Sequence, residues 1–204
     1  MKKIGIYGGT FNPIHNGHLN MVKQMAIMIG LDNILIIPTN IPPHKEESAI
    51  AESRHRYEMC RLACGENHLF EICDLELKRE GRSYTVDTLN EISSTYINSN
   101  LYFMMGSDSF LSVSRWLGFE EIIKLAALCT APRNIKEIPQ LVKMEQLLRS
   151  RGANTIICDI SIMPISSTEI RSRISRGLSV EEMVPKKVID YIDKNGLYTS
   201  NKST

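Results

Sequence analysis

The chain has 204 residues, of which 43% are hydrophobic and 23% charged, and its formal net charge at pH 7 is +1. This composition excludes disordered and fibrous classes, and the length suits one domain with a sizeable core. The near-neutral charge gives no reason to expect a nucleic-acid-binding surface, so a phosphate site would have to be built from particular residues. No apolar run approaches the roughly 18 residues of a membrane span, and no signal-peptide pattern is visible.

The first predicted element is a buried strand, Lys3–Tyr7, which leads through the sequence GGTFNPIHNGH into an amphipathic helical pattern over 19–29. Gly8 and Gly9 therefore stand where the strand ends. Glycines there allow a sharp turn and let a ligand approach the main chain closely. The helix that follows would offer unpaired N–H groups and a partial positive charge to an anion.

Two histidines, His15 and His18, stand at the start of this helix. Their i,i+3 spacing puts both imidazoles on nearly the same face, where each can donate to a phosphate oxygen. Phosphoryl or nucleotidyl transfer needs such positioned donors more than covalent help. The alternative is a pair of surface histidines in a glycine-rich turn.

A second predicted strand, Asn33–Ile37, precedes the stiff, proline-rich sequence PTNIPPHK at 38–45. His44 and Lys45 at its end could hold a phosphate. The alternative is a basic pair on the surface. The position directly after a strand favours the phosphate site.

Further strand and helix patterns alternate along the rest of the chain. The predicted strands are Leu101–Met105, Ala126–Thr130 and Asn154–Cys158. The predicted helices are Ile50 to Cys64, one that begins at Ser83 as its N-cap, Pro139 to Arg151, Ser167–Arg176 and Pro185–Asn195, the last ended by Gly196. This alternation predicts an α/β fold with a doubly wound parallel sheet, whose ligands bind beyond the carboxyl ends of the strands.

Asp108 and Trp116 follow the third of these strands. Asp108, in the sequence GSDS, would serve either as a turn or capping residue or as a carboxylate that accepts from ribose hydroxyls. A lone tryptophan is usually a core residue. Trp116 lies outside any clear apolar period, however, so it could instead be a stacking platform for an aromatic ring.

The sequence Ser166-Ser167-Thr168 precedes a helical pattern that contains Arg171. Serine and threonine cap helices routinely, and capping explains part of this pattern. Hydroxyls, N–H groups and an arginine one turn later also make a second anion site.

The five cysteines show no disulfide-like spacing, and we expect reduced core thiols in a cytoplasmic protein: Cys60, Cys64, Cys73, Cys129 and Cys158. The alternative is a metal clip made by Cys60 and Cys64 with His55 or His68. The absence of a second cysteine pair argues against it, and we expect no protein-bound metal site.

Six segments in order resemble the HxGH nucleotidyltransferases, and within them the bacterial nicotinate-nucleotide adenylyltransferases. The matching segments cover essentially the whole chain: GGTFNPIHNGH, PTNIPPHK, RSYT with DTL, GSDS with Trp116, ISSTEIR, and the stretch from Val184 to Tyr198. The resemblance implies a Rossmann-like nucleotidyltransferase fold with C-terminal helices, in one domain over 1–198 with a polar tail at 199–204.

The resemblance also implies a reaction, in which the adenylyl group of ATP passes to nicotinate mononucleotide. The products are nicotinate adenine dinucleotide and pyrophosphate, in NAD biosynthesis. The enzyme would need Mg²⁺, carried by ATP, because the sequence shows no dedicated carboxylate cage. Nucleic acid and membrane partners are not expected, and a homo-oligomer remains open.

The resemblance assigns a role to each matching residue. His15, His18 and Arg171 would be catalytic. Residues that would hold the nucleotide are Gly8, Gly9, Thr10, Phe11, Ser166, Ser167, Thr168 and Arg171. Residues that would hold the mononucleotide are Asn40, His44, Lys45, Tyr84, Thr85, Asp108 and Trp116, with Trp116 stacked on the pyridine ring and Tyr84 and Thr85 near its carboxylate.

Other enzymes share parts of this pattern. A phosphopantetheine adenylyltransferase or a cytidylyltransferase would give no reason for Trp116 beside an aspartate-bearing turn. A class I aminoacyl-tRNA synthetase would need tRNA-binding domains for which the chain has no room. A nucleotide-sensing module without catalysis would tolerate the loss of either histidine, and both are present.

Overall fold

A computed structural model describes residues 1–40, 50–65 and 67–199. Within these ranges, six parallel strands form one sheet in the order β3-β2-β1-β4-β5-β6. The strands are β1 (Lys2–Gly9), β2 (Asn33–Pro38), β3 (Phe70–Ile72), β4 (Ser99–Met104), β5 (Ala126–Thr130) and β6 (Thr155–Ile157). The doubly wound parallel sheet is therefore confirmed, and the predicted strand ends are displaced by two residues or fewer.

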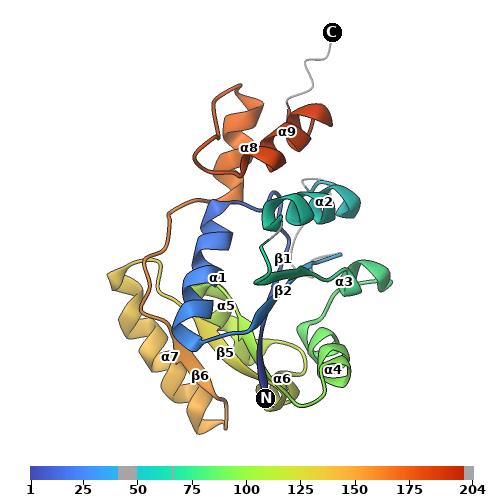
Figure 1. Ribbon diagram of the computed structural model, residues 1–204. Helices are drawn as coiled ribbons and strands as arrows, with labels where there is room; N and C mark the ends of the chain where they lie inside the picture. The colour runs from blue at the N-terminus through green and yellow to red at the C-terminus, as the bar shows by residue number, and fades with distance from the viewer. Residues whose placement is uncertain (41–49, 66, 200–204) are drawn as a thin grey trace.

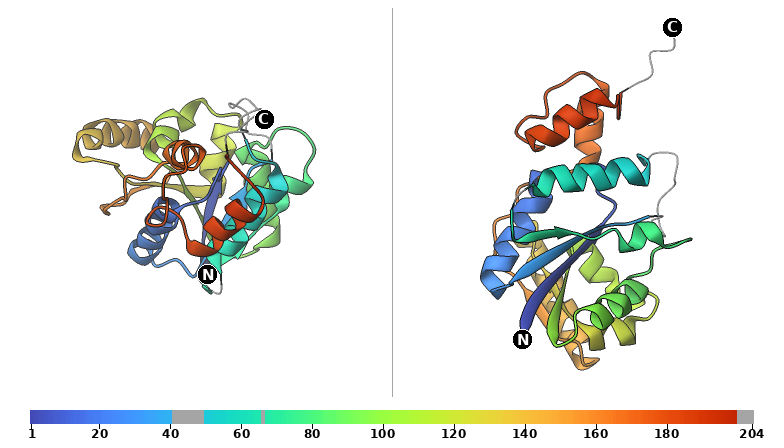
Figure 2. Two further views of the ribbon diagram at one scale, coloured as in Figure 1. Left: turned by 90° about the horizontal axis from the view of Figure 1, so that it is seen from above. Right: turned by 45° about the vertical axis from the view of Figure 1, so that its right-hand side comes forward.

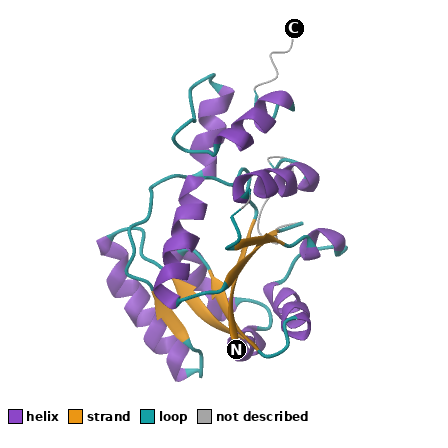
Figure 3. Ribbon diagram, in the orientation of Figure 1, coloured by secondary structure: helices purple, strands orange, loops and turns teal. Residues whose placement is uncertain are grey.

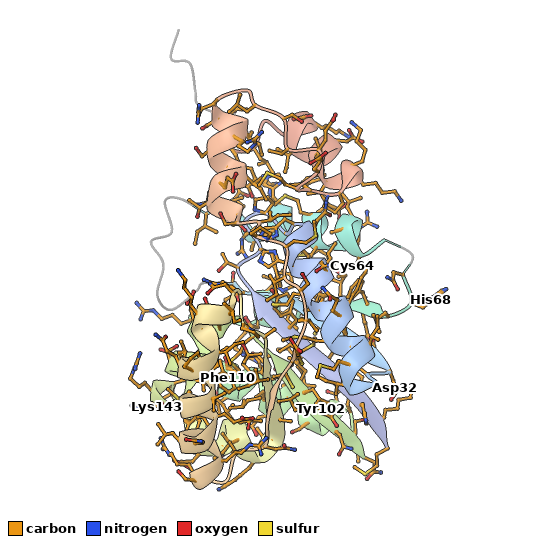
Figure 4. The ribbon with its side chains drawn as sticks, turned by 90° about the vertical axis from the view of Figure 1, so that its left-hand side faces the viewer. Asp32, Cys64, His68, Tyr102, Phe110 and Lys143 are labelled. Atoms are coloured by element: carbon orange, nitrogen blue, oxygen red, sulfur yellow. The ribbon has the colours of Figure 1, made fainter. Side chains whose placement is uncertain are left out.

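Helices cover both faces of the sheet (Figures 1 and 3). In β2, Ile34 and Ile36 belong to the core under one helical layer, and Leu35 and Ile37 to the core under the other. A strand's side chains alternate between faces, so an unbroken apolar strand such as this one must be covered on both sides. Phe110 accordingly points into the interior, whereas Lys143 lies at the outer edge (Figure 4).

The longer helices agree with the predicted ones, with ends displaced by three residues or fewer. They are α1 (Asn16–Ile29), α2 (Ser53–Cys64), α4 (Thr85–Thr95), α7 (Ile138–Ser150), α8 (Ser167–Ser175) and α9 (Lys186–Lys194). The prediction that Ser83 caps the third helix is wrong. Helix α4 begins after Tyr84, and the Ser83 hydroxyl instead accepts a hydrogen bond from the Asn40 N–H group.

Three short helices and strand β3 were not predicted from the sequence. The helices are α3 (Leu75–Lys78), α5 (Ser107–Ser112) and α6 (Phe119–Leu125). These helices have four to seven residues, about two turns at most, and β3 has three residues. Elements this short do not show a hydrophobic periodicity that could identify them. Gly196, with a φ of 59°, does end the last helix as expected.

Strand β1 runs from the N-terminus toward the end of the molecule where α8 and α9 lie (Figure 2). Hydrogen bonds tie that end together: the Ser167 hydroxyl donates to the Pro13 carbonyl, and the Asn16 N–H group donates to the Met183 carbonyl. The C-terminal helices thus lie beside the carboxyl end of the central strand. No helix of the described residues is long and apolar enough to cross a membrane.

Candidate active site

Three neighbouring cavities lie at the carboxyl ends of β1 and β4, and they share walls. The central cavity, of about 680 Å³, contacts Gly8, Thr10 and Arg171. The second, of about 400 Å³, also contacts Gly8 and Thr10 and adds Tyr84 and Thr85. The third, of about 710 Å³, shares His18, Ser167 and Thr168 with the central cavity. Ligands in the central and second cavities would therefore meet at the end of β1, and ligands in the central and third cavities at His18 and the start of α8.

Gly8 and Gly9 are the last residues of β1, and neither has a positive φ. The expectation that they form a sharp turn is wrong, because the chain turns later, at Phe11, whose φ is 45°. The reason for Gly9 is steric: a Cβ atom there would lie 2.9 Å from the Phe11 ring. A Cβ at Gly8 would meet no atom closer than 4.0 Å, so Gly8 keeps cavity space open rather than relieving a contact.

A buried arginine that the sequence analysis missed, Arg56 of α2, fixes the loop after β1. Its guanidinium donates to the carbonyls of Thr10 and Thr39 at 2.9 and 2.5 Å, and to those of Asn40 and Ala51 at 2.9 Å each. Burial lowers the pKa of Arg56 from its ordinary value. One side chain thus joins the ends of β1 and β2 to the start of α2. A basic residue inside a helical pattern gives no sequence signal for this.

His15 is the N-cap of α1, and its Nδ1 accepts from the His18 N–H group at 3.3 Å. The two imidazoles stack, with ring centroids 3.6 Å apart and planes 21° apart. Burial lowers the pKa of His15 to about 4, so at neutral pH its ring is uncharged. Because Nδ1 is the acceptor, the single ring proton is on Nε2, which leaves an N–H donor on this ring.

His18 lies in the first turn of α1 and lines both the central and the third cavity. The edge-to-face contact with Phe11, whose ring centroid lies 5.4 Å away, and the stack on His15 orient its imidazole. The expectation of several unpaired N–H groups at this helix start is wrong in part. The N–H groups of Asn16 and His18 already donate to Met183 and His15.

The start of α8 supplies the second predicted group of phosphate ligands. Ser166 caps the helix by accepting from the Glu169 N–H group at 3.2 Å, so capping is confirmed. Ser167, Thr168 and Arg171 line the central cavity. Arg171 also donates to the Asn12 carbonyl at 2.8 Å, which fixes one end of its guanidinium at the cavity wall.

Trp116 is half-buried and forms part of the wall between the central and second cavities. Its ring lies edge-on to Phe103, with centroids 6.1 Å apart, and its Nε1 donates to the Ser112 hydroxyl at 3.4 Å. A tryptophan anchored in this way presents an aromatic surface to a ligand. Tyr84 and Thr85 line the second cavity with it, at the start of α4.

Two predicted substrate residues do not line these cavities. The Asp108 side chain is exposed and pairs with Arg133 at 2.6 Å, and Asn40 binds the Arg79 carbonyl through its side chain at 3.1 Å. His44 and Lys45 lie outside the described residues. Arg133, which the sequence analysis missed, contacts the central and third cavities. It follows β5, as the other motifs follow their strands, and that position was the available signal.

The cysteines are unpaired, and one carboxylate, that of Glu76, is buried near the cavities. All five cysteines are free thiols, and burial raises the pKa of Cys64 to about 12. In the described part of the chain, no three His, Cys, Asp or Glu side chains lie close enough together to hold a metal ion. Glu76 is buried beside the second cavity, where its carboxylate accepts from the Thr88 hydroxyl at 2.8 Å and burial raises its pKa.

Comparison with known sequences gives near full-length matches. A family model described as cytidylyltransferase-like matches residues 6–173. A probable nicotinate-nucleotide adenylyltransferase of Dictyoglomus thermophilum is 41% identical, with 96% of this chain and 99% of the relative covered. One of Clostridium tetani is 35% identical, with 97% and 100% covered.

Comparison with solved structures identifies the same fold. The nicotinic acid mononucleotide adenylyltransferase of Plasmodium falciparum complexed with NaAD aligns with a TM-score of 0.77 and 22% identity, over 97% of this chain and 98% of that one. A putative nicotinate-nucleotide adenylyltransferase from Vibrio parahaemolyticus aligns with a TM-score of 0.69 and 20% identity, over 97% and 96%.

Proposed function

The chain belongs to the nicotinate-nucleotide adenylyltransferases, and from this premise we propose how its residues carry out the family's reaction. The reaction transfers the adenylyl group of ATP to nicotinate mononucleotide and gives nicotinate adenine dinucleotide and pyrophosphate, a step of NAD biosynthesis. One observation carries the assignment of substrates to the site. Gly8, Gly9 and Thr10 line both the central and the second cavity, so two ligands can meet at one backbone segment.

We propose that the nucleoside of ATP lies in the third cavity and its phosphates in the central one. His15, Gly17 and Ser166 line the third cavity, and Ser167 and Thr168 line both the third and the central cavity. Arg171, one turn further along α8, would hold the β- and γ-phosphates in the central cavity. An arginine fork and hydroxyls at a helix start are the donors that phosphate oxygens require.

Nicotinate mononucleotide then occupies the second cavity, with its pyridine ring against Trp116. Tyr84 and Thr85, at the first turn of α4, lie where the ring's carboxylate would be read. An aromatic face beside a helix N-terminus suits a flat ring that carries an anionic group. Asp108 is not assigned to the ribose, because its carboxylate pairs with Arg133.

The proposed chemistry is an in-line displacement. An oxygen of the acceptor's 5′-phosphate attacks the α-phosphorus of ATP, and the bond from that phosphorus to the αβ-bridging oxygen breaks as pyrophosphate leaves. His18, which lines the central and third cavities, and the neutral His15, which lines the third, would donate to the oxygens on which charge develops. Arg133, paired with Asp108, lies at the wall that these two cavities share. Because positioning and electrostatics suffice, no covalent intermediate with the chain is required.

ATP-dependent nucleotidyl transfer generally uses a divalent metal ion, and we propose Mg²⁺. The described residues offer no cluster of acidic or histidine ligands for it. Mg²⁺ commonly keeps several waters and binds through substrate phosphates. The ion would therefore enter with ATP and neutralise its phosphates.

We also propose that residues 1–198 form one nucleotidyltransferase domain and that the protein acts in the cytoplasm.

His18→Ala tests the assignment of the central cavity to the reacting phosphates. Removal of one preorganised donor should lower kcat by roughly 10²–10³-fold. The measurement is pyrophosphate release from ATP, Mg²⁺ and nicotinate mononucleotide, with the midpoint of thermal unfolding as a check on the fold. Wild-type turnover in a folded His18→Ala variant would remove His18 from the mechanism.

A further inference from the structure

The loop after β1 is fixed from the far end of the chain as well as from its neighbours. The Tyr198 hydroxyl donates to Oδ1 of Asn12 at 2.8 Å, although 186 positions separate the two residues. The same oxygen accepts from the Ala51 N–H group at 3.1 Å. Asn12 is buried, so these two donors fix the orientation of its side chain.

Asn12 is also the residue that holds Arg171. Its main-chain carbonyl accepts from the Arg171 guanidinium at 2.8 Å, and the next carbonyl, of Pro13, accepts from the Ser167 hydroxyl at 2.9 Å. The orientation of the Asn12 peptide therefore sets where the guanidinium of Arg171 lies in the central cavity. A displacement of about 1 Å in such a group can cost a large factor in rate.

Tyr198 also lies near Arg171. Thr168, Arg171 and Tyr198 line one shallow hollow on the surface beside the central cavity. Burial raises the pKa of the Tyr198 hydroxyl, while Arg171 and Arg56 act in the opposite direction. The phenol thus stays protonated at neutral pH and remains a donor to Asn12.

The backbone conformation at Tyr198 is unusual for a tyrosine. Its φ is 63°, in the left-handed region that a tyrosine seldom adopts. Such a conformation persists when surrounding contacts determine it, and it is found more often at functional sites. Here the contact that anchors the side chain is the hydrogen bond to Asn12.

We propose that Tyr198 is a positioning residue for adenylyl transfer, which acts through Asn12 to hold the Arg171 guanidinium against the phosphates of ATP. The inference rests on the proposed role of Arg171. It makes the segment after α9 part of the active site, although Tyr198 is not among the residues that line the three substrate cavities. Loss of the Tyr198 hydroxyl should therefore change the KM for ATP and leave the KM for nicotinate mononucleotide nearly unchanged.

Tyr198→Phe removes only the hydroxyl. Loss of one hydrogen bond should raise the KM for ATP and lower kcat, each by roughly 3- to 10-fold, and leave the KM for nicotinate mononucleotide within about 2-fold. Tyr191→Phe is the matched control, because that hydroxyl contacts His55 Nδ1 at 2.9 Å, away from the cavities, and its removal should leave the kinetics unchanged.

A double-mutant cycle identifies the route of the effect. In an Arg171→Lys background, Tyr198→Phe should add less than about 2-fold, because the group that it positions is already gone. Wild-type kinetics of Tyr198→Phe, or equal rises in both KM values, would overturn the proposal. Full additivity with Arg171→Lys would also overturn it, while a strong effect of Arg171→Lys alone would leave the proposed function standing.

Discussion

His15 and His18 differ in their surroundings although three positions separate them. His15 is buried under the stack and accepts from the main chain, whereas His18 faces two cavities. The imidazoles stack with centroids 3.6 Å apart, and burial lowers the pKa of His15 to about 4, so that this ring is neutral at pH 7. The pair therefore offers one fixed neutral donor beside one cavity-facing ring.

The pKa of His15 predicts a pH dependence of stability. In the folded chain this pKa is about 4, below the roughly 6.5 of an unfolded histidine, so the unfolded state binds the extra proton between those values. Stability should be complete above about pH 6.5 and fall as the pH drops, by about 2 kcal/mol at pH 5.

The check is urea unfolding at pH 5 and pH 8 of the wild type and of His15→Asn. Asparagine keeps an N-cap acceptor but does not titrate. The difference in unfolding free energy between the two pH values should be smaller in His15→Asn than in the wild type by about 2 kcal/mol. Equal pH dependence in both proteins would show that His15 is not the group that titrates.

Substitution of Trp116 tests whether the second cavity binds nicotinate mononucleotide. Trp116→Ala should raise the KM for nicotinate mononucleotide by roughly 10-fold or more, since aromatic stacking contributes about 1–3 kcal/mol per base in comparable sites. The KM for ATP should change much less. Steady-state kinetics in both substrates give the answer, and equal changes in the two KM values would assign Trp116 to the core.

At the end of strand β1, Gly9 is required by the packing of Phe11, whereas Gly8 leaves space for a ligand. Gly9→Ala would place a Cβ against the Phe11 ring and should destabilise the fold by about 1–3 kcal/mol. Gly8→Ala meets only open space, so its unfolding free energy should stay near that of the wild type while both KM values rise. Urea unfolding and kinetics of the two variants distinguish these effects, and a reversed pattern would contradict the geometry.

The main elements could be predicted because their signals are local. The unbroken apolar run of β2 and the helical period after His18 depend on neighbours in sequence, so five strands and six helices were found within a few residues of their ends. Helix α3 and strand β3 were missed because four and three residues carry no period. The displaced turn at Phe11 depends on its positive φ, which no neighbour in the sequence signals.

Site residues were predictable where a motif stands at the end of a strand. Thr10, Trp116 and Arg171 lie in the cavity walls as expected. Arg56 and Tyr198 act through contacts across 46 and 186 positions, which no local pattern reveals. The ion pair of Asp108 with Arg133 could not be predicted, because it depends on the packing of β4 beside β5.

At the scale of the whole molecule, the doubly wound sheet brings the carboxyl ends of β1 and β4 together, and the C-terminal helices lie across that edge. Three adjoining cavities then provide space for a nucleotide, its phosphates and an acceptor. Each cavity is lined by segments far apart in the sequence. The site therefore exists only in the complete fold.

Pyrophosphate release from ATP and Mg²⁺, with nicotinate mononucleotide, nicotinamide mononucleotide and phosphopantetheine as alternative acceptors, tests the proposed function most directly. We expect a strong preference for nicotinate mononucleotide, because its carboxylate would meet the first turn of α4 beside Trp116. Activity with nicotinamide mononucleotide alone, or with phosphopantetheine, would contradict the assignment of the second cavity.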